Sequence, residues 1–511
     1  MCPSVCQCYS VNATCADLFS DVTDMTQETF HSGLRGLRVT GSSRLDLEED
    51  LFLTWNITKL TLLDLSQNNI TKIWQWAFCS LANLMHLDLS GNSITTLDSQ
   101  TFYNNTRLFW LSLAKNSITY IHPLTFQNNV NLLFIDIDEN KITSLDADLF
   151  KNNVELEMVG LDYNRITDIH PSTFRKNWRL WSVSLIGNRI SSIDTETFDH
   201  NLLLVKLDLS NNSISDVHPA TFRNNIRLRI LDISKNKITL VNPDTFIHNR
   251  ELRFLYLQGN NITEISNSSF RGLQQLKDFD LSINNIEELN PLVFHNTLNR
   301  THDQNHKAST LKRLNLAQNK IRSFNFELYF PMSSNSDSSN PTFQLEYLNL
   351  NSNRLTTLDV ASMKWLNHTT TVTDLTGNPW NCDCSALLEV WRGLKHKLTL
   401  HCASPEQLQG KSWDVIEVFC SLVGGPSVVT TTLMVTGVLL VCAIGGGLIF
   451  AKLVKRRRNK PKTPEYCDVY APRASYVSIH YYAEVGAGTS NVTDQSYADV
   501  GKRPSYISVQ S

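Results

Sequence analysis

A period of 24 residues runs through most of this chain and limits what it can fold into. An asparagine recurs at the same point of ten consecutive copies, from Asn68 to Asn284, and a phenylalanine follows each by ten residues, from Phe78 to Phe294. Ahead of each asparagine stands the pattern L-x-x-L-x-L, in which other apolar residues replace leucine in some copies. A period in this range predicts a solenoid, a stack of similar structural units.

The residue types within one copy indicate how each unit folds. The L-x-L segment places two apolar side chains on one side of a short strand, because strand side chains alternate in direction. One unit cannot bury them alone, so neighbouring units stack into a continuous core. The asparagine is expected to pair backbone groups in a buried turn, and the phenylalanine to fill the wider outer side. A helical repeat is disfavoured, since L-x-L has the period of a strand.

The phrase L-x-x-L-x-L-x-x-N resembles the signature of leucine-rich repeats. The resemblance implies an α/β repeat fold, a horseshoe-shaped solenoid of about 12–13 repeats over residues 34–374. The repeats that end at Asn319 and Asn353 carry roughly ten additional residues each, in polar inserts that we expect to be surface loops.

Cysteines lie almost entirely outside the repeats. One even cluster precedes them and another follows, and the array itself contains only Cys79. Such clusters predict disulfide-stabilised end caps, over residues 1–33 and 375–420, in an oxidising compartment. Spacing alone does not select the pairing within four cysteines.

The segments CPSVCQC and NPWNCDC resemble the amino- and carboxy-terminal caps of extracellular leucine-rich repeat proteins, including Slit, Toll and Tartan-like receptors and adhesion molecules. The resemblance covers residues 1 to about 420. It implies the disulfides Cys2–Cys8, Cys6–Cys15, Cys382–Cys402 and Cys384–Cys420.

Glycosylation motifs of the form N-x-S/T support an extracellular location. They occur at Asn12, Asn56, Asn69, Asn104, Asn211, Asn261, Asn267, Asn299 and Asn367. The sequence opens at Met1-Cys2-Pro3, without a charged and apolar leader, so we expect that a signal peptide is missing from it, and a misassigned start codon is the alternative.

A membrane anchor is predicted after a short linker, 421–427. Residues 428–451 form an uncharged apolar run long enough to span a bilayer, and a cluster of lysines and arginines follows directly. The positive-inside bias predicts a single-pass type I protein of the plasma membrane with the repeats outside. Ala443, Gly447 and Ala451 form a small-residue ridge that would let two such helices pair as a homodimer.

The remaining segment, 452–511, is predicted to be a disordered cytoplasmic tail too short for a Toll-type signalling domain. Five tyrosines carry an aliphatic residue at the third position after them: Tyr466, Tyr476, Tyr482, Tyr497 and Tyr506. This spacing resembles phosphotyrosine sites that dock SH2 proteins, in which an arginine pocket grips the phosphate. The same spacing also resembles endocytic signals that bind clathrin adaptors.

The ligand site is predicted on outward strand positions. Trp110, Phe134 and Met158 occupy one such column in consecutive repeats, with Tyr163 and Trp181 close in register. Large apolar side chains that the core does not need mark a protein-contact site, and repeat proteins commonly bind through this surface. The next outward column is rich in aspartate, which we expect to solvate the strand. Calcium is disfavoured because these carboxylates lie a whole repeat apart.

Catalytic, cofactor and metal motifs are not found, so we predict that the protein is not an enzyme. The net charge of −3 implies no nucleic-acid partner. The leading interpretation is a receptor that binds a protein or glycoconjugate outside and recruits SH2 proteins inside. The alternative is a cell-adhesion molecule whose tail serves endocytic sorting.

Overall fold

The computed structural model describes most of the repeats and parts of both caps. The described residues are 6–16, 30, 33–41, 45–290, 293–294, 310–330, 345–382, 401–411 and 416. Contacts divide the chain into two units, Met1–Gly425 and Pro426–Ser511. The predicted membrane segment and tail belong to the second unit and lie outside the described residues. Within the described part, no helix has the length and apolarity needed to cross a membrane.

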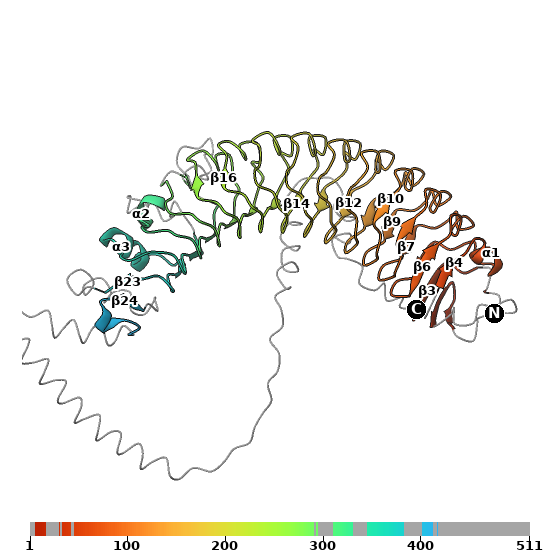
Figure 1. Ribbon diagram of the computed structural model, residues 1–511, viewed down its shortest axis with the longest axis horizontal. Coiled ribbons are helices and arrows are strands. Elements are labelled where there is room, and N and C mark those ends of the chain that lie inside the picture. The colour runs from red at the N-terminus through yellow and green to blue at the C-terminus, as the bar shows by residue number, and fades with distance from the viewer. Residues whose placement is uncertain are drawn as a thin grey trace, which may run out of the picture. The chain divides into compact units, whose positions relative to one another are not determined.

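One long sheet organises the first unit, and its strands follow the inner side of the curved stack in Figure 1. Its first two strands are antiparallel, and every later neighbour is parallel. In spatial order the strands are β1 (Cys6–Tyr9), β2 (Asn12–Ala16), β3 (Gly36–Thr40), β5 (Leu62–Asp64), β7 (His86–Asp88), β9 (Trp110–Ser112), β11 (Phe134–Asp136), β12 (Met158–Gly160), β13 (Ser182–Ser184), β14 (Lys206–Asp208), β15 (Ile230–Asp232), β17 (Phe254–Tyr256), β19 (Asp278–Asp280), β20 (Arg313–Asn315), β21 (Tyr347–Asn349) and β22 (Val372–Asp374).

Short elements occupy the rest of the described stack. The two-stranded sheets pair β4 (Leu45–Leu47) with β6 (Ile70–Ile73), β8 (Thr96–Leu97) with β10 (Tyr120–Ile121), β16 (Leu240–Val241) with β18 (Glu264–Ile265), and β23 (Trp380–Asn381) with β24 (Cys402–Ser404). The helices are α1 (Leu51–Thr54), α2 (Phe326–Tyr329), α3 (Val360–His368) and the 3-10 helix η3 (Glu406–Leu408).

The solenoid and its apolar core are confirmed. Leucines of the L-x-x-L-x-L pattern are completely buried, as at Leu108, Leu111 and Leu113. The periodic phenylalanines form a second buried row, in which consecutive rings stack, for example Phe126 on Phe150 with 6.1 Å between ring centroids. The phenylalanines therefore fill the outer side of the stack, as predicted from their period.

The periodic asparagine connects consecutive units through backbone groups. The Nδ2 group of Asn164 donates to the carbonyls of Ile137 (2.9 Å), Leu161 (3.2 Å) and Asp162 (3.3 Å). Its Oδ1 accepts from the N–H of Ile142 at 3.0 Å. The same pattern continues beyond the enlarged repeats to Asn378, which belongs to the segment predicted as the carboxy-terminal cap.

A second asparagine row was not predicted from the sequence. Asn177 is fully buried, and its Nδ2 donates to the carbonyls of Phe150 (2.9 Å) and Asn153 (2.7 Å), 27 and 24 residues earlier. Seven repeats share this arrangement, at Asn105, Asn129, Asn153, Asn177, Asn201, Asn225 and Asn249. The signal in the sequence is an asparagine three residues before the first leucine of the strand pattern in these seven repeats.

Two of the four expected disulfides lie within the described residues. Cys6–Cys15 joins β1 to β2, and Cys382–Cys402 joins the segments that form β23 and β24. Cys8 is disulfide-bonded as well, and its expected partner Cys2 lies outside the described residues. Cys384–Cys420 falls outside them too. Among the described cysteines, Cys79 is a free thiol.

Candidate functional site

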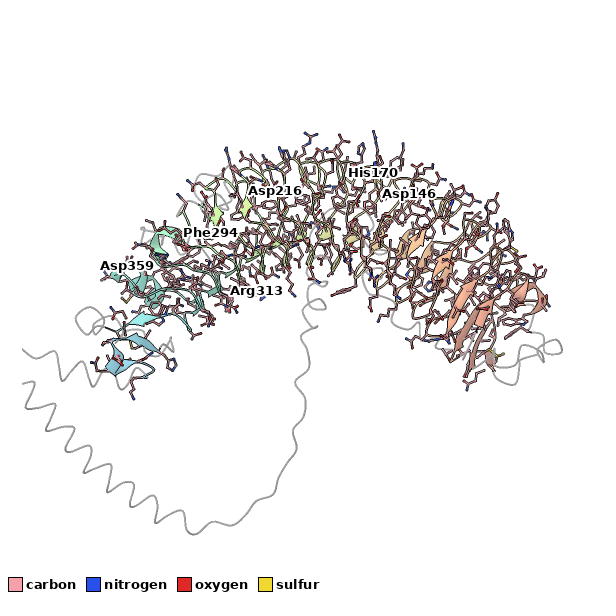
Figure 2. All side chains as sticks on the ribbon, viewed as in Figure 1. Asp146, His170, Asp216, Phe294, Arg313 and Asp359 are labelled. Carbon is pink, nitrogen blue, oxygen red and sulfur yellow. A yellow bond between two sulfur atoms is a disulfide. The ribbon has the colours of Figure 1, made fainter. Side chains whose placement is uncertain are left out.

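The sheet register places the outward residues of successive repeats in rows. Strands pair residue for residue, so that His86, Trp110, Phe134 and Met158 are direct neighbours. Figure 2 shows a later member of this row, Arg313, on the inner side of the stack, whereas His170 lies on the outer side.

Aromatic rings stack along this row. The His86 and Trp110 rings are nearly parallel and stacked, with 3.8 Å between their centroids. Phe134 stacks on Trp110 with 5.7 Å between centroids. Burial lowers the pKa of His86 to about 4, although Asp64 opposes the shift, so the imidazole is neutral at physiological pH. His86 therefore extends the apolar row by one repeat.

Residues immediately before the strands enlarge this surface. Met85 and Phe109 are exposed, and Leu133 is half-buried. They precede His86 and the two aromatic residues of the row. We call the whole surface the aromatic patch, and it comprises Met85, His86, Phe109, Trp110, Leu133, Phe134 and Met158. Met85, Phe109 and Leu133 were missed in the sequence because they belong to a column that was not considered, and His86, in the same column as Trp110, was not selected as a ligand residue.

The other two predicted ligand residues lie apart from this row. Trp181 immediately precedes β13 and is half-buried, next in register after Glu157. Tyr163 is exposed, in the turn that follows β12, and its ring lies over Gly187 of the next repeat. The structure thus joins Trp110, Phe134 and Met158 in one row and places Tyr163 beyond the end of the strand.

The aspartates of the neighbouring row have a local structural role that the sequence prediction missed. We expected them to solvate the strand, but their Oδ1 atoms accept a hydrogen bond from the backbone N–H two residues later, as Asp232 does from Ser234 at 2.9 Å. The Ser234 N–H lies between the N–H groups of Ile233 and Lys235, which donate to carbonyls of the next repeat. It has no backbone carbonyl as a partner in the sheet. The same bond occurs at Asp64, Asp88, Asp136, Asp208, Asp280 and Asp374.

Acidic groups accumulate near the centre of the sheet. Burial raises the pKa of Asp162 to about 6 and that of Asp232 to about 7, and the charge of Asp208 adds to both shifts. Burial likewise raises the pKa of Asp208. Hydrogen bonds from the turns and the Lys206 ammonium oppose these shifts. The cluster therefore holds protons in the folded chain at a pH where the unfolded chain has released them.

Asp232→Asn should stabilise the protein at pH 8, because it removes a buried charge and keeps the Oδ1 acceptor for Ser234. A folded pKa above the unfolded value lowers stability as pH rises from about 4 to 7. The free energy of unfolding of the variant minus that of the wild type should therefore grow across this range and be smallest near pH 3.5. Guanidinium titrations at several pH values measure this difference, and a pH-independent difference would contradict the prediction.

Later strands carry paired charges. Arg229 pairs with Glu251 at 3.2 Å, and Arg313 pairs with Asp278 at 3.1 Å. Ion pairs thus appear on the outward face from β15 onward, where they stand among further apolar and aromatic residues such as Ile230 and Phe254. In the described part of the chain, no group of histidines, cysteines and acids could hold a metal ion.

Most of the predicted glycosylation sites have an exposed asparagine side chain. Seven of these asparagines are exposed, namely Asn56, Asn69, Asn104, Asn211, Asn261, Asn267 and Asn367. Asn12 is half-buried in β2, and Asn299 lies outside the described residues. Glycosylation itself stays a prediction.

A parallel-sheet solenoid with periodic leucine and asparagine rows defines a repeat-type binding scaffold. Five overlapping segments match the family model described as Leucine rich repeat, at residues 58–118, 106–166, 154–212, 203–262 and 250–299. Residues 344–366 match a second model of the same description. The chain belongs to the leucine-rich repeat family.

Known proteins share the fold at low sequence identity. A leucine-rich repeat protein of Leptospira interrogans has a TM-score of 0.56 at 19% identity, over 74% of this chain and 94% of that one. A structure of the Drosophila Toll–Spatzle complex in its glycosylated form has a TM-score of 0.56 at 21% identity, over 75% of this chain and 54% of that one.

The sequence relative is matched only locally. Nephrocan of Mus musculus is 43% identical over 74 residues, which is 14% of this chain and 14% of nephrocan. These similarities establish the repeat fold and leave the activity to be argued from the surface.

Proposed function

We propose that this protein is a cell-surface receptor that binds a protein ligand through the aromatic patch. The observation that carries the proposal is the row of half-buried, stacked rings at His86, Trp110 and Phe134, which lies outside the leucine core. Aromatic and methionine side chains are enriched at the centres of protein interfaces, where they exclude water from a large area. A neutral His86 adds no charge that a ligand would have to desolvate.

Ring stacking and the hydrogen bonds of the bordering aspartates favour a protein over a glycan as the ligand. Trp110 is stacked between His86 and Phe134, so a sugar could reach only the edge of the Trp110 ring. The bordering aspartates are engaged by backbone N–H groups of their own turns, which limits their use for sugar hydroxyls. The Toll–Spatzle structure is that of a leucine-rich repeat protein in a protein complex, in keeping with this choice.

The remainder of the proposal rests on the sequence. Residues 428–451 would anchor the chain, and the five tail tyrosines would dock SH2 proteins after phosphorylation. The competing function is adhesion, in which the patch holds another cell and the tail binds clathrin adaptors for sorting.

Full-length chains on cultured cells distinguish these functions. We expect Trp110→Ala combined with Phe134→Ala to remove the partner captured by extracellular proximity labelling, and to remove co-precipitation of SH2 proteins. Truncating central aromatic contacts typically costs about 2–4 kcal/mol of binding, which is roughly a 30-fold to 1,000-fold loss of affinity. Tyr120→Ala, an exposed ring away from the patch, is the matched control.

A tail variant separates the two halves of the proposal. Tyr→Phe at Tyr466, Tyr476, Tyr482, Tyr497 and Tyr506 should keep the labelled partner and lose the SH2 proteins. Aggregation of expressing cells that survives the tail variant, together with clathrin adaptors alone on the tail, would instead establish adhesion with sorting.

A further inference from the structure

Five consecutive repeats present an apolar side chain to solvent on the flank where the chain enters each strand. Trp178, Leu202 and Ile226 are 53%, 52% and 56% exposed, Val130 is 45% exposed, and Val154 is half-buried. We call this row the flank ridge. Polar residues end it at both sides, Thr106 in the repeat before and Arg250 in the repeat after.

The backbone holds these side chains outward. Each ridge residue follows a buried asparagine of the second row, whose carbonyl accepts the N–H of the leucine three residues later, as Asn177 does from Leu180 at 3.1 Å. Trp178 and Arg179 are therefore the two central residues of a tight turn. Since Nδ2 of Asn177 is fixed by two carbonyls, the turn cannot rotate its side chains inward. The ridge is a permanent apolar surface that the fold itself does not need.

Charged residues run parallel to the ridge, one position further along each turn. Glu155 and Arg179 form an ion pair of 2.6 Å in neighbouring repeats. Arg227 lies two repeats after Arg179 and is exposed. Leu203, between them, is also exposed and widens the apolar surface at the centre.

We propose that the flank ridge is a homodimer interface, with a second copy of this chain as its occupant. A two-fold axis that crosses the ridge between Trp178 and Leu202 pairs each of these residues with the other in the second copy. It also pairs Val154 with Ile226. The same operation brings Glu155 opposite Arg227 of the second copy, twice by symmetry.

Charge complementarity favours a two-fold axis between Trp178 and Leu202 over an axis through Leu202. An axis through Leu202 would place Glu155 opposite Glu251 and Arg179 opposite Arg227, so that like charges face each other at both ends. In the proposed register the four central ridge residues meet apolar partners, Arg179 lies opposite Leu203, Val130 lies opposite Arg250, and Glu155 lies opposite Arg227 at both ends. This is the arrangement of an isologous interface.

Glycosylation motifs leave the ridge uncovered. The sequence contains none between Asn104 and Asn211. Asn104 lies one repeat before the ridge begins, and Asn211 follows the strand β14, at the opposite end of that repeat's strand from Leu202. A glycosylated ectodomain would therefore still expose the five ridge residues to a second copy.

Two differently tagged full-length copies in one cell test the interface through surface cross-linking and co-precipitation. Leu202→Asp puts a charge at the apolar centre and should lower pairing about tenfold or more. Leu53→Asp, at an equally exposed leucine in α1, should leave pairing unchanged. Unchanged pairing in Leu202→Asp would overturn the proposal and assign any dimer to another segment, such as 428–451.

Charge reversal tests the register itself. Glu155→Lys copies should not pair with one another, and neither should Arg227→Glu copies, because each homodimer would face like charges twice. A Glu155→Lys copy mixed with an Arg227→Glu copy should pair again, since both contacts become complementary. Failure of the mixed pair to recover would contradict the two-fold arrangement. The Trp110→Ala and Phe134→Ala variant should pair normally, which separates this interface from ligand binding.

Discussion

Phe150→Ala should lower the free energy of unfolding by about 3–5 kcal/mol, the usual cost of emptying a buried phenylalanine site. Its ring is fully buried between Phe126 and Phe174, with centroids 6.1 and 6.0 Å away. The flanking rings belong to other repeats and are fixed by their own leucines, so they cannot move in to fill the space. The cavity therefore persists.

Guanidinium unfolding of the wild type and the variant measures this loss. Hydrogen exchange locates it, because repeats interact chiefly with their neighbours and protection should fall first around β11, β12 and β13. Phe109→Ala is the matched control, since Phe109 is exposed and its loss should cost less than about 1 kcal/mol. Equal losses in the two variants would show that the phenylalanine row does not stabilise the stack.

Asn164→Asp should be about as costly, roughly 3–5 kcal/mol, although it changes a single atom type. The Nδ2 donor serves three carbonyls, and its replacement by a carboxylate oxygen leaves them facing a second acceptor. The new charge is also buried, since Asn164 is 5% exposed. Burial would raise the carboxyl pKa, so the defect should shrink on acidification below about pH 5.

An exposed neighbour provides the control for this substitution. Asn152→Asp changes the same atoms in the same part of the stack at an exposed site, where Nδ2 bonds one carbonyl, that of Gln127. It should cost less than about 1 kcal/mol at every pH. A pH-independent defect in Asn164→Asp would contradict the buried-charge explanation.

The aromatic patch shows how far the sequence predicted the binding surface. Trp110, Phe134 and Met158 were predicted together because they share one strand position in a fixed register, and the pairing of β9, β11 and β12 brings them together. The register could not predict that His86 stacks on Trp110 as a neutral ring. Ring orientation and desolvation depend on three neighbouring strands at once, so neither can be predicted from the residue type alone.

The aspartates and the flank ridge were less predictable for a related reason. From the sequence alone, an aspartate on a strand is expected to be solvated, because the turn that follows it is not known. Ser234 N–H approaches the Asp232 carboxylate only because the backbone bends there. Likewise, Trp178 and Leu202 resemble core residues by type, and the tight turn after each buried asparagine directs them outward.

The sequence by itself determined the solenoid, its leucine core, its phenylalanine row and the asparagine row through Asn164. These follow from the period, because a contact between neighbouring units always joins residues one repeat apart. Tertiary structure alone decided the neutral state of His86, the raised pKa of Asp232 and the outward direction of the flank ridge. Each depends on the direction of a backbone turn or on burial by neighbouring repeats, and residue spacing along the chain encodes neither.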